Sequence, residues 1–189
     1  MGFNRTSRAG QLHTLPCLCD PTYQARIHEA IAAAALRAAD GLTDEAAITA
    51  AMETASRAEV ERLQAEHVRF GEHLDESVLT TDLAGVSRVT IRGLSGAQLA
   101  DAETAGRLAA TKAKAKAKDS DPFMDTEVIR AGLVSVEGFD EAPGVNGYPV
   151  EALSSPGGMA EWGTFRDEVA MHIRTWSTLG ESVLSPSVP

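Results

Sequence analysis

The chain is poor in aromatic residues, cysteines and long apolar runs. Aromatic residues make up 5% of its 189 residues, and there are only two cysteines. Two cysteines are too few for a disulfide scaffold, so a reducing cytoplasm is expected. No stretch reaches the roughly 18 apolar residues of a membrane span, and the first residues lack the apolar core of a signal peptide.

Alanine supplies much of the 43% apolar content. Alanine favours helix but buries little surface, so the composition predicts a helical protein with a thin core that a partner completes. The chain has 27 acidic and 17 basic residues, for a net charge of −10. This balance argues against a general nucleic-acid binder and favours basic or apolar partners.

The lysines are the exception to this acidity, because they form one run at Lys112, Lys114, Lys116 and Lys118. Strict alternation within a helix spreads charge around the whole circumference and leaves no apolar face. We therefore interpret residues 111–121 as a solvated helix end or a linker, rather than as a site for nucleic acid or membrane.

Residues 1–20 are predicted to form an extended N-terminal segment. The apolar run from Leu12 to Cys19 fits an edge strand, because Pro16 cannot donate a ladder hydrogen bond.

Residues 21–80 are predicted to form a helical hairpin. Asp20-Pro21 is a typical helix start, and Asp40-Gly41 a typical stop. Thr43 is expected to cap a second helix that runs to about Leu74. Two long helices joined by a short link indicate an antiparallel pair.

Residues 81–118 are predicted to form a strand, a turn and a helix. Val89 and Ile91 alternate with polar residues, as in a half-buried strand. Ser95 and Gln98 have the spacing of a capping box, in which each side chain satisfies a free backbone N–H group.

Residues 119–189 are predicted to form a C-terminal helical region with a long loop at 137–158. Residues 123–136 fit one compact apolar helix, and a closing amphipathic helix follows the loop. The whole pattern predicts a mainly α fold with a small β element (α+β). The closing helix has one apolar face, which is core alone or a surface shared with a partner. Its predicted partner-binding residues are Trp162, Phe165, Val169, Ile173 and Trp176.

No residue pattern predicts catalysis, a cofactor or a metal. Cys17 and Cys19 are separated by one residue, whereas paired zinc cysteines are separated by at least two, so we interpret them as small apolar side chains. His67 and His73 do not match the metalloprotease motif and are expected to face solvent. We therefore expect that the protein is not an enzyme.

Three segments resemble tail assembly chaperones of long-tailed (siphovirus-like) bacteriophages. They are the apolar Leu15–Pro21, the strand-turn-helix Val89–Ser95, and Glu127–Val136 ahead of the closing helix. The resemblance implies a non-enzymatic protein of the host bacterial cytoplasm that coats and solubilises the tape measure protein and helps to recruit the tail tube protein. From the net charge and the lack of an apolar span, we expect no nucleic-acid and no membrane partner, while a homo-oligomer is possible.

Two other classes of function remain as alternatives. One is a phage virion structural component, such as a head–tail connector or minor tail protein, whose loop and tails order against neighbouring subunits. The other is a small hydrolase or metal-dependent enzyme, which would need a convergent polar pocket. The presence of the chain in purified particles distinguishes a virion component from a chaperone.

Overall fold

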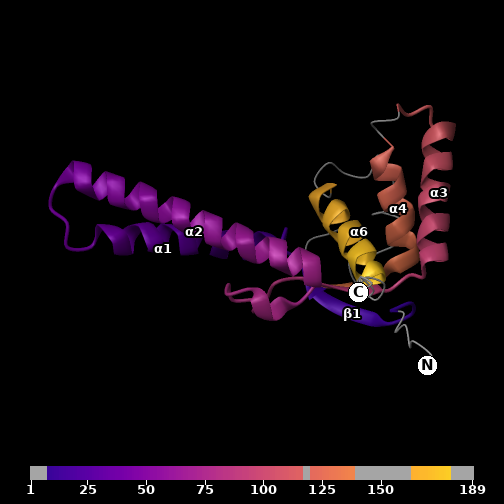
Figure 1. The fold of residues 1–189 in the computed structure, drawn as a ribbon, viewed down its shortest axis with the longest axis horizontal. Helices are drawn as coiled ribbons and strands as arrows, with labels where there is room; N and C mark the ends of the chain where they lie inside the picture. Colours follow the sequence, from indigo (N-terminus) through magenta and orange to yellow (C-terminus); the bar gives the residue numbers. More distant parts are fainter. Residues whose placement is uncertain (1–7, 117–119, 139–162, 180–189) are drawn as a thin grey trace, which may run out of the picture. The chain divides into compact units, whose positions relative to one another are not determined.

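The computed structural model describes residues 8–116, 120–138 and 163–179, and the chain divides into two compact units. Unit 1 comprises residues 1–17 and 87–189, and unit 2 comprises residues 18–86. The described residues are mostly helical and include a small antiparallel sheet (Figure 1). This confirms the predicted mainly α fold with a small β element.

The sheet of unit 1 has three antiparallel strands in the order β1-β2-β3. They are β1 (Leu12–Pro16), β2 (Arg88–Arg92) and β3 (Leu133–Glu137). The central strand carries the core residues, since Val89 and Ile91 are fully buried while the residues between and beside them are not. This is the alternation expected of a strand with one covered face.

Three helices complete the described part of unit 1: α3 (Gly96–Lys112), α4 (Asp121–Gly132) and α6 (Gly163–Thr178). Helix α3 packs against α4, and α6 packs against α4 and contacts β2. The predicted capping box is present at the start of α3, with the Ser95 side chain and the Gln98 side chain each accepting the other's backbone N–H.

The prediction of one helix over residues 123–136 was wrong at its C-terminal end. Helix α4 ends at Gly132, and Leu133–Glu137 forms β3 beside β2. Leu133 is buried as the helical pattern required, but in the sheet. A short apolar run rich in valine fits either element, and here the ladder with β2 decided the outcome.

Unit 2 is built on an antiparallel hairpin of α1 (Pro21–Ala39) and α2 (Glu45–His73) (Figure 1). A short 3-10 helix, η1 (Glu76–Val78), and a connector up to Val86 follow α2. In the described part of the chain, no helix combines the length and the apolar character needed to cross a membrane.

The two helices of the hairpin begin at aspartate caps. The Asp20 side chain accepts the backbone N–H of Thr22 at 2.7 Å. Asp44, rather than the predicted Thr43, caps α2 by accepting the N–H of Ala47 at 2.8 Å. A carboxylate at this position also interacts favourably with the positive end of the helix dipole, which a threonine hydroxyl does less well.

The structure groups the four predicted segments differently. Because β1 pairs with β2, the extended N-terminal segment lies with the strand-turn-helix and the C-terminal region in unit 1. The hairpin makes up most of unit 2. Most of the predicted long loop at 137–158 lies outside the described residues.

Gly106 sets the close packing of α3 on α4. A Cβ atom at this position would lie 2.5 Å from Cα of Met124 and 2.8 Å from the carbonyl oxygen of Phe123. These are backbone atoms, so a side chain cannot be accommodated by a rotamer change, and the two helices would have to move apart.

We predict that Gly106→Ala lowers the free energy of unfolding by about 1–3 kcal/mol, because it overpacks this helix contact. Gly71→Ala is the matched control, since Gly71 lies within α2 and a Cβ there meets open space. It should raise stability by about 0.5–1 kcal/mol. Denaturant unfolding followed by circular dichroism measures both, and equal stability of the two variants would contradict the tight contact.

Candidate functional site

Four of the five predicted partner-binding residues lie on α6, and they differ in burial. Phe165, Val169 and Ile173 are buried in the core of unit 1, with exposed fractions of 4% or less. Trp176 is only half-buried, and Trp162 lies outside the described residues. A partner could reach the first three only if α6 left the sheet and α4, so partner binding by this face stays a prediction.

Trp176 is held by the segment that leads into β1. Its ring stacks on His13 with 4.0 Å between the ring centroids, and the guanidinium carbon of Arg8 lies 3.8 Å from its centroid. Its Nε1–H donates to the carbonyl of Gln11 at 3.3 Å. His13 and Arg8 therefore cover the two faces of the ring, and Trp176 stays partly exposed in a fixed orientation.

Ion pairs connect α6 to its two neighbouring helices. The Arg174 guanidinium lies 2.6 Å from the Asp125 carboxylate of α4 and 3.4 Å from that of Glu103 of α3. Burial raises the pKa of Asp125, and Arg174 acts against that shift. Arg174 therefore compensates a carboxylate that would otherwise be costly to bury.

His172 is buried on α6, one residue before Ile173. Burial lowers its pKa to about 4, and the nearby His13 acts in the same direction. The imidazole is therefore neutral at physiological pH, and charging it in place would oppose the packing of α6.

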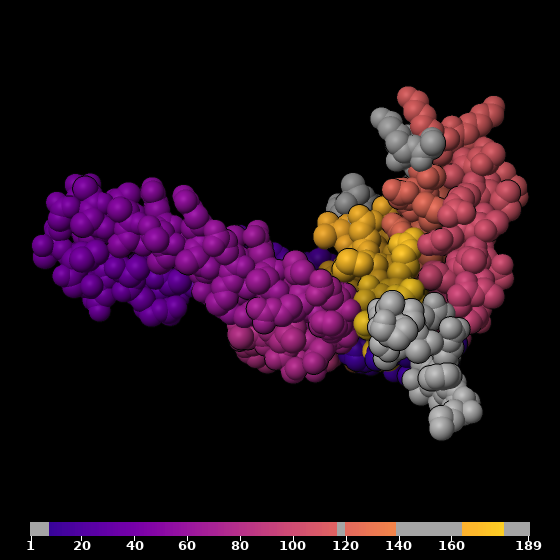
Figure 2. Space-filling view, viewed as in Figure 1, coloured from indigo at the N-terminus to yellow at the C-terminus, as the bar shows by residue number. Residues whose placement is uncertain are grey.

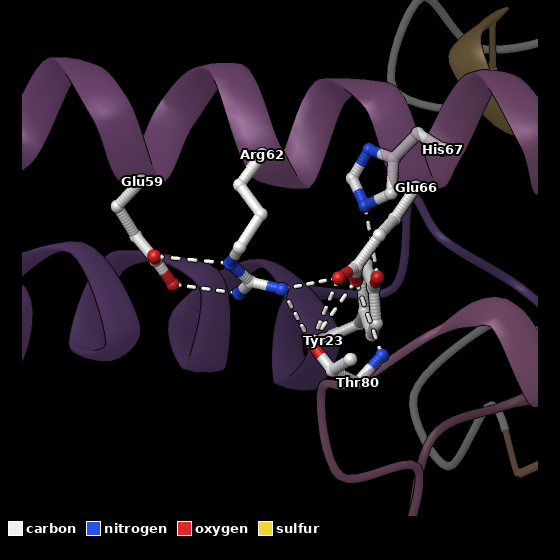
Figure 3. Close-up of polar contacts among 6 residues, drawn as sticks. All are labelled: Tyr23, Glu59, Arg62, Glu66, His67 and Thr80. Atoms are coloured by element: carbon white, nitrogen blue, oxygen red, sulfur yellow. Dashed lines mark hydrogen bonds and ion pairs between the residues drawn. The ribbon is translucent and has the colours of Figure 1, made fainter.

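The most connected polar cluster is in unit 2, where it joins α1, α2 and the connector (Figure 3). The Tyr23 hydroxyl of α1 and Nε2 of His67 on α2 form a hydrogen bond of 2.8 Å. The Glu66 carboxylate accepts both the backbone N–H and the hydroxyl of Thr80, each at 3.1 Å. Tyr23 is fully buried and Glu66 is 7% exposed.

Arg62 extends this cluster along α2. Its guanidinium donates two hydrogen bonds to the Glu59 carboxylate, at 2.6 and 3.0 Å, and it also pairs with Glu66. The Arg62 guanidinium also donates a hydrogen bond of 2.7 Å to the Thr80 hydroxyl. The hydrogen bond from Arg62 lowers the pKa of Glu59. The polar groups of this cluster already form hydrogen bonds and ion pairs with one another. This arrangement is typical of a cluster that stabilises the fold.

His67 does not face solvent as predicted, whereas His73 is exposed. Helical spacing from Leu63 and Phe70 would have placed His67 beside the core, and this signal was missed. Burial lowers the pKa of His67, and the charge of Glu66 opposes that shift.

The described residues contain no group of three His, Cys, Asp or Glu side chains that could hold a metal ion. Cys17 is buried, while Cys19 is partly exposed in the turn after β1. Strand β1 ends at Pro16, so neither cysteine of the predicted strand lies within it. Both are reduced.

A shallow groove of about 610 Å³ runs along the first turns of α2. Its lining residues are Asp44, Glu45, Ala46, Thr49, Ala50 and Glu53. It offers three carboxylates around small side chains and no cation, so an anionic ligand is disfavoured there.

Comparison of the chain with protein-family models, with curated proteins and with solved structures finds no match.

We predict that Glu66→Ala lowers the free energy of unfolding by about 1–3 kcal/mol, because it leaves the Thr80 N–H without its acceptor. Glu61→Ala is the control, since Glu61 is exposed on the same helix, and its effect should stay within about 0.5 kcal/mol. Denaturant unfolding measures both. A loss no larger than that of the control would show that the cluster does not hold the connector.

We also predict that His172 makes the protein acid-sensitive. Because its folded pKa is depressed, its contribution to stability is complete above its ordinary value of 6.5 and is lost as the pH falls towards about 4. The loss is on the order of 3 kcal/mol. Between pH 7 and pH 4, the free energy of unfolding should decrease less steeply for His172→Gln than for the parent protein. The exposed-site control His73→Gln should follow the parent, and parallel profiles for all three proteins would contradict the assignment.

Proposed function

We propose that the protein is a non-enzymatic tail assembly chaperone that binds and solubilises the tape measure protein of a long-tailed bacteriophage. The observation that carries this proposal is the distribution of charge. Unit 2 contains 13 acidic residues, five arginines and no lysine, so it holds −8 of the net charge of −10.

An acidic helical unit suits the task of keeping an apolar partner in solution. A long apolar helical chain aggregates because its exposed faces associate with one another. Bound to a strongly charged protein, it gains net charge, and like charges keep separate complexes apart. The resemblance to tail assembly chaperones and the mainly helical fold support the same function.

The predicted face on α6 offers one residue to such a partner while unit 1 stays folded. Trp176 is half-exposed, and Met171 on the same helix is 46% exposed. An amphipathic partner helix is recognised through apolar anchors of this kind.

Co-expression with the downstream tape measure reading frame tests the function directly. The tape measure protein should be insoluble alone and should become soluble and co-purify in the presence of this chain. Purified phage particles should lack the chain. Its stoichiometric presence in particles, without any effect on tape measure solubility, would favour the alternative of a virion structural component.

Two substitutions separate binding from folding on α6. We predict that Trp176→Ala destabilises unit 1 by only about 1–2 kcal/mol, through the lost ring stack and cation–π contact. It should weaken tape measure binding by about 2 kcal/mol, roughly thirtyfold. Ile173→Ala, at a fully buried position, should cost about 2–5 kcal/mol of stability. Thermal melting and pull-down measure the two effects, and undiminished binding by folded Trp176→Ala would remove this face from the interface.

A further inference from the structure

The hairpin of unit 2 is packed unevenly along its length. Near its base, the buried apolar residues come from both helices and from the connector: Tyr23, Leu63, Phe70, Leu74, Leu79 and Val86. From residue 24 to residue 62, which we call the hairpin tip, Ala35 is the only buried residue. The space-filling view shows the same contrast within unit 2, since the connector thickens the base whereas the tip consists of the two helices (Figure 2).

The apolar residues of the tip are half-buried at helical spacing. Ile27 and Ile31 of α1 are four residues apart, and Ile48, Met52 and Ala55 of α2 follow the same rhythm. Two helices cover each other along one line only, so both flanks of the line between them stay open. At the base, the connector covers one flank and burial becomes complete. The tip therefore has the pattern of a bundle that lacks its third helix.

Two further apolar side chains of the tip are exposed. Leu36 is 65% exposed near the end of α1, and Leu42 is 41% exposed in the link between the helices. Apolar side chains gathered at one end of a unit indicate an interaction surface more strongly than the same side chains scattered singly.

The negative charge around the tip favours a basic partner over a second copy of the protein. No basic residue lies between Arg37 and Arg57, and the four acidic residues in that interval give it a net charge of −4. Three of them, Asp44, Glu45 and Glu53, line the groove along α2. A second copy of the hairpin would bring the same four carboxylates to the contact, so self-association is opposed by like-charge repulsion.

We propose that the hairpin tip binds a positively charged amphipathic helix of another protein, which completes a three-helix bundle with α1 and α2. The apolar face of that helix would cover Ile31 and Met52, and its Lys or Arg residues would flank the carboxylates of the groove. This surface is separate from Trp176. The inference does not rest on the proposed function, because it specifies the chemistry of the partner rather than its identity.

The probe is a designed helical peptide of leucine and lysine, about 18 residues and therefore about 27 Å long, with leucine on one face. Fluorescence anisotropy with the full chain should show binding that weakens as salt is added. A peptide with glutamate in place of lysine should bind at least tenfold more weakly. Equal binding of the two peptides would overturn the assignment of a basic partner.

Two substitutions on α2 locate the contact. Met52→Asp should weaken binding of the lysine peptide by tenfold or more, because it places a charge under the apolar face. Ala58→Asp adds the same charge at an exposed position of the same helix and should change binding less than threefold, towards tighter binding. If circular dichroism shows that Met52→Asp loses helix, Met52→Ala replaces it, with a loss of about threefold expected. Equal effects at positions 52 and 58 would overturn the site.

A photo-cross-linking version of the lysine peptide tests the site in the unmodified protein. Adducts should map to residues 24–62. Adducts confined to unit 1, or a stable dimer of the protein with cross-links between hairpin tips, would overturn the proposal. Binding of the peptide without capture of the tape measure protein would leave this surface intact and contradict the proposed function alone. Capture of the tape measure protein without binding of the peptide would support the proposed function and overturn the assignment of the hairpin tip as a binding surface.

Discussion

Two antiparallel helices cannot bury the residues between them on both sides, and this constraint governs the whole of unit 2. Where the connector supplies a third layer, Phe70 and Leu74 are buried almost completely. Where only α1 and α2 are present, Ile31 and Met52 remain only half-buried. Burial of apolar surface is the main stabilising term in folding, so the tip is the weakly held part of this unit.

Polar contacts lie at the end of the region of the hairpin that the connector covers. The Glu66 carboxylate receives Thr80, and Arg62 extends the same network one turn further towards the tip. In unit 1, Arg174 has a comparable role, because it connects α6 to α4 and α3 beside the buried Ile173. In both units, paired charges add to the apolar contacts that hold an element in place.

Local signals in the sequence predicted much of the fold. The caps at Asp20 and Ser95 were identified because their hydrogen bonds involve residues two or three positions away. Long-range contacts were not predictable in this way. The pattern around Leu133 fitted a helix, but this segment pairs with β2 in the sheet. His67 forms a hydrogen bond with Tyr23, which lies 44 residues away in the sequence. The spacing of the five predicted residues showed an apolar stripe in the sequence, but it did not distinguish the buried residues from the partly exposed Trp176.

The hairpin tip lacks the third layer that the connector supplies at the base of the hairpin. Native-state hydrogen exchange of the isolated protein tests it most directly, because amides report the free energy of local opening residue by residue. Amides of α2 near Phe70 should be protected far more strongly than those near Met52, with the boundary close to Arg62. Uniform protection along the whole of α2 would contradict it.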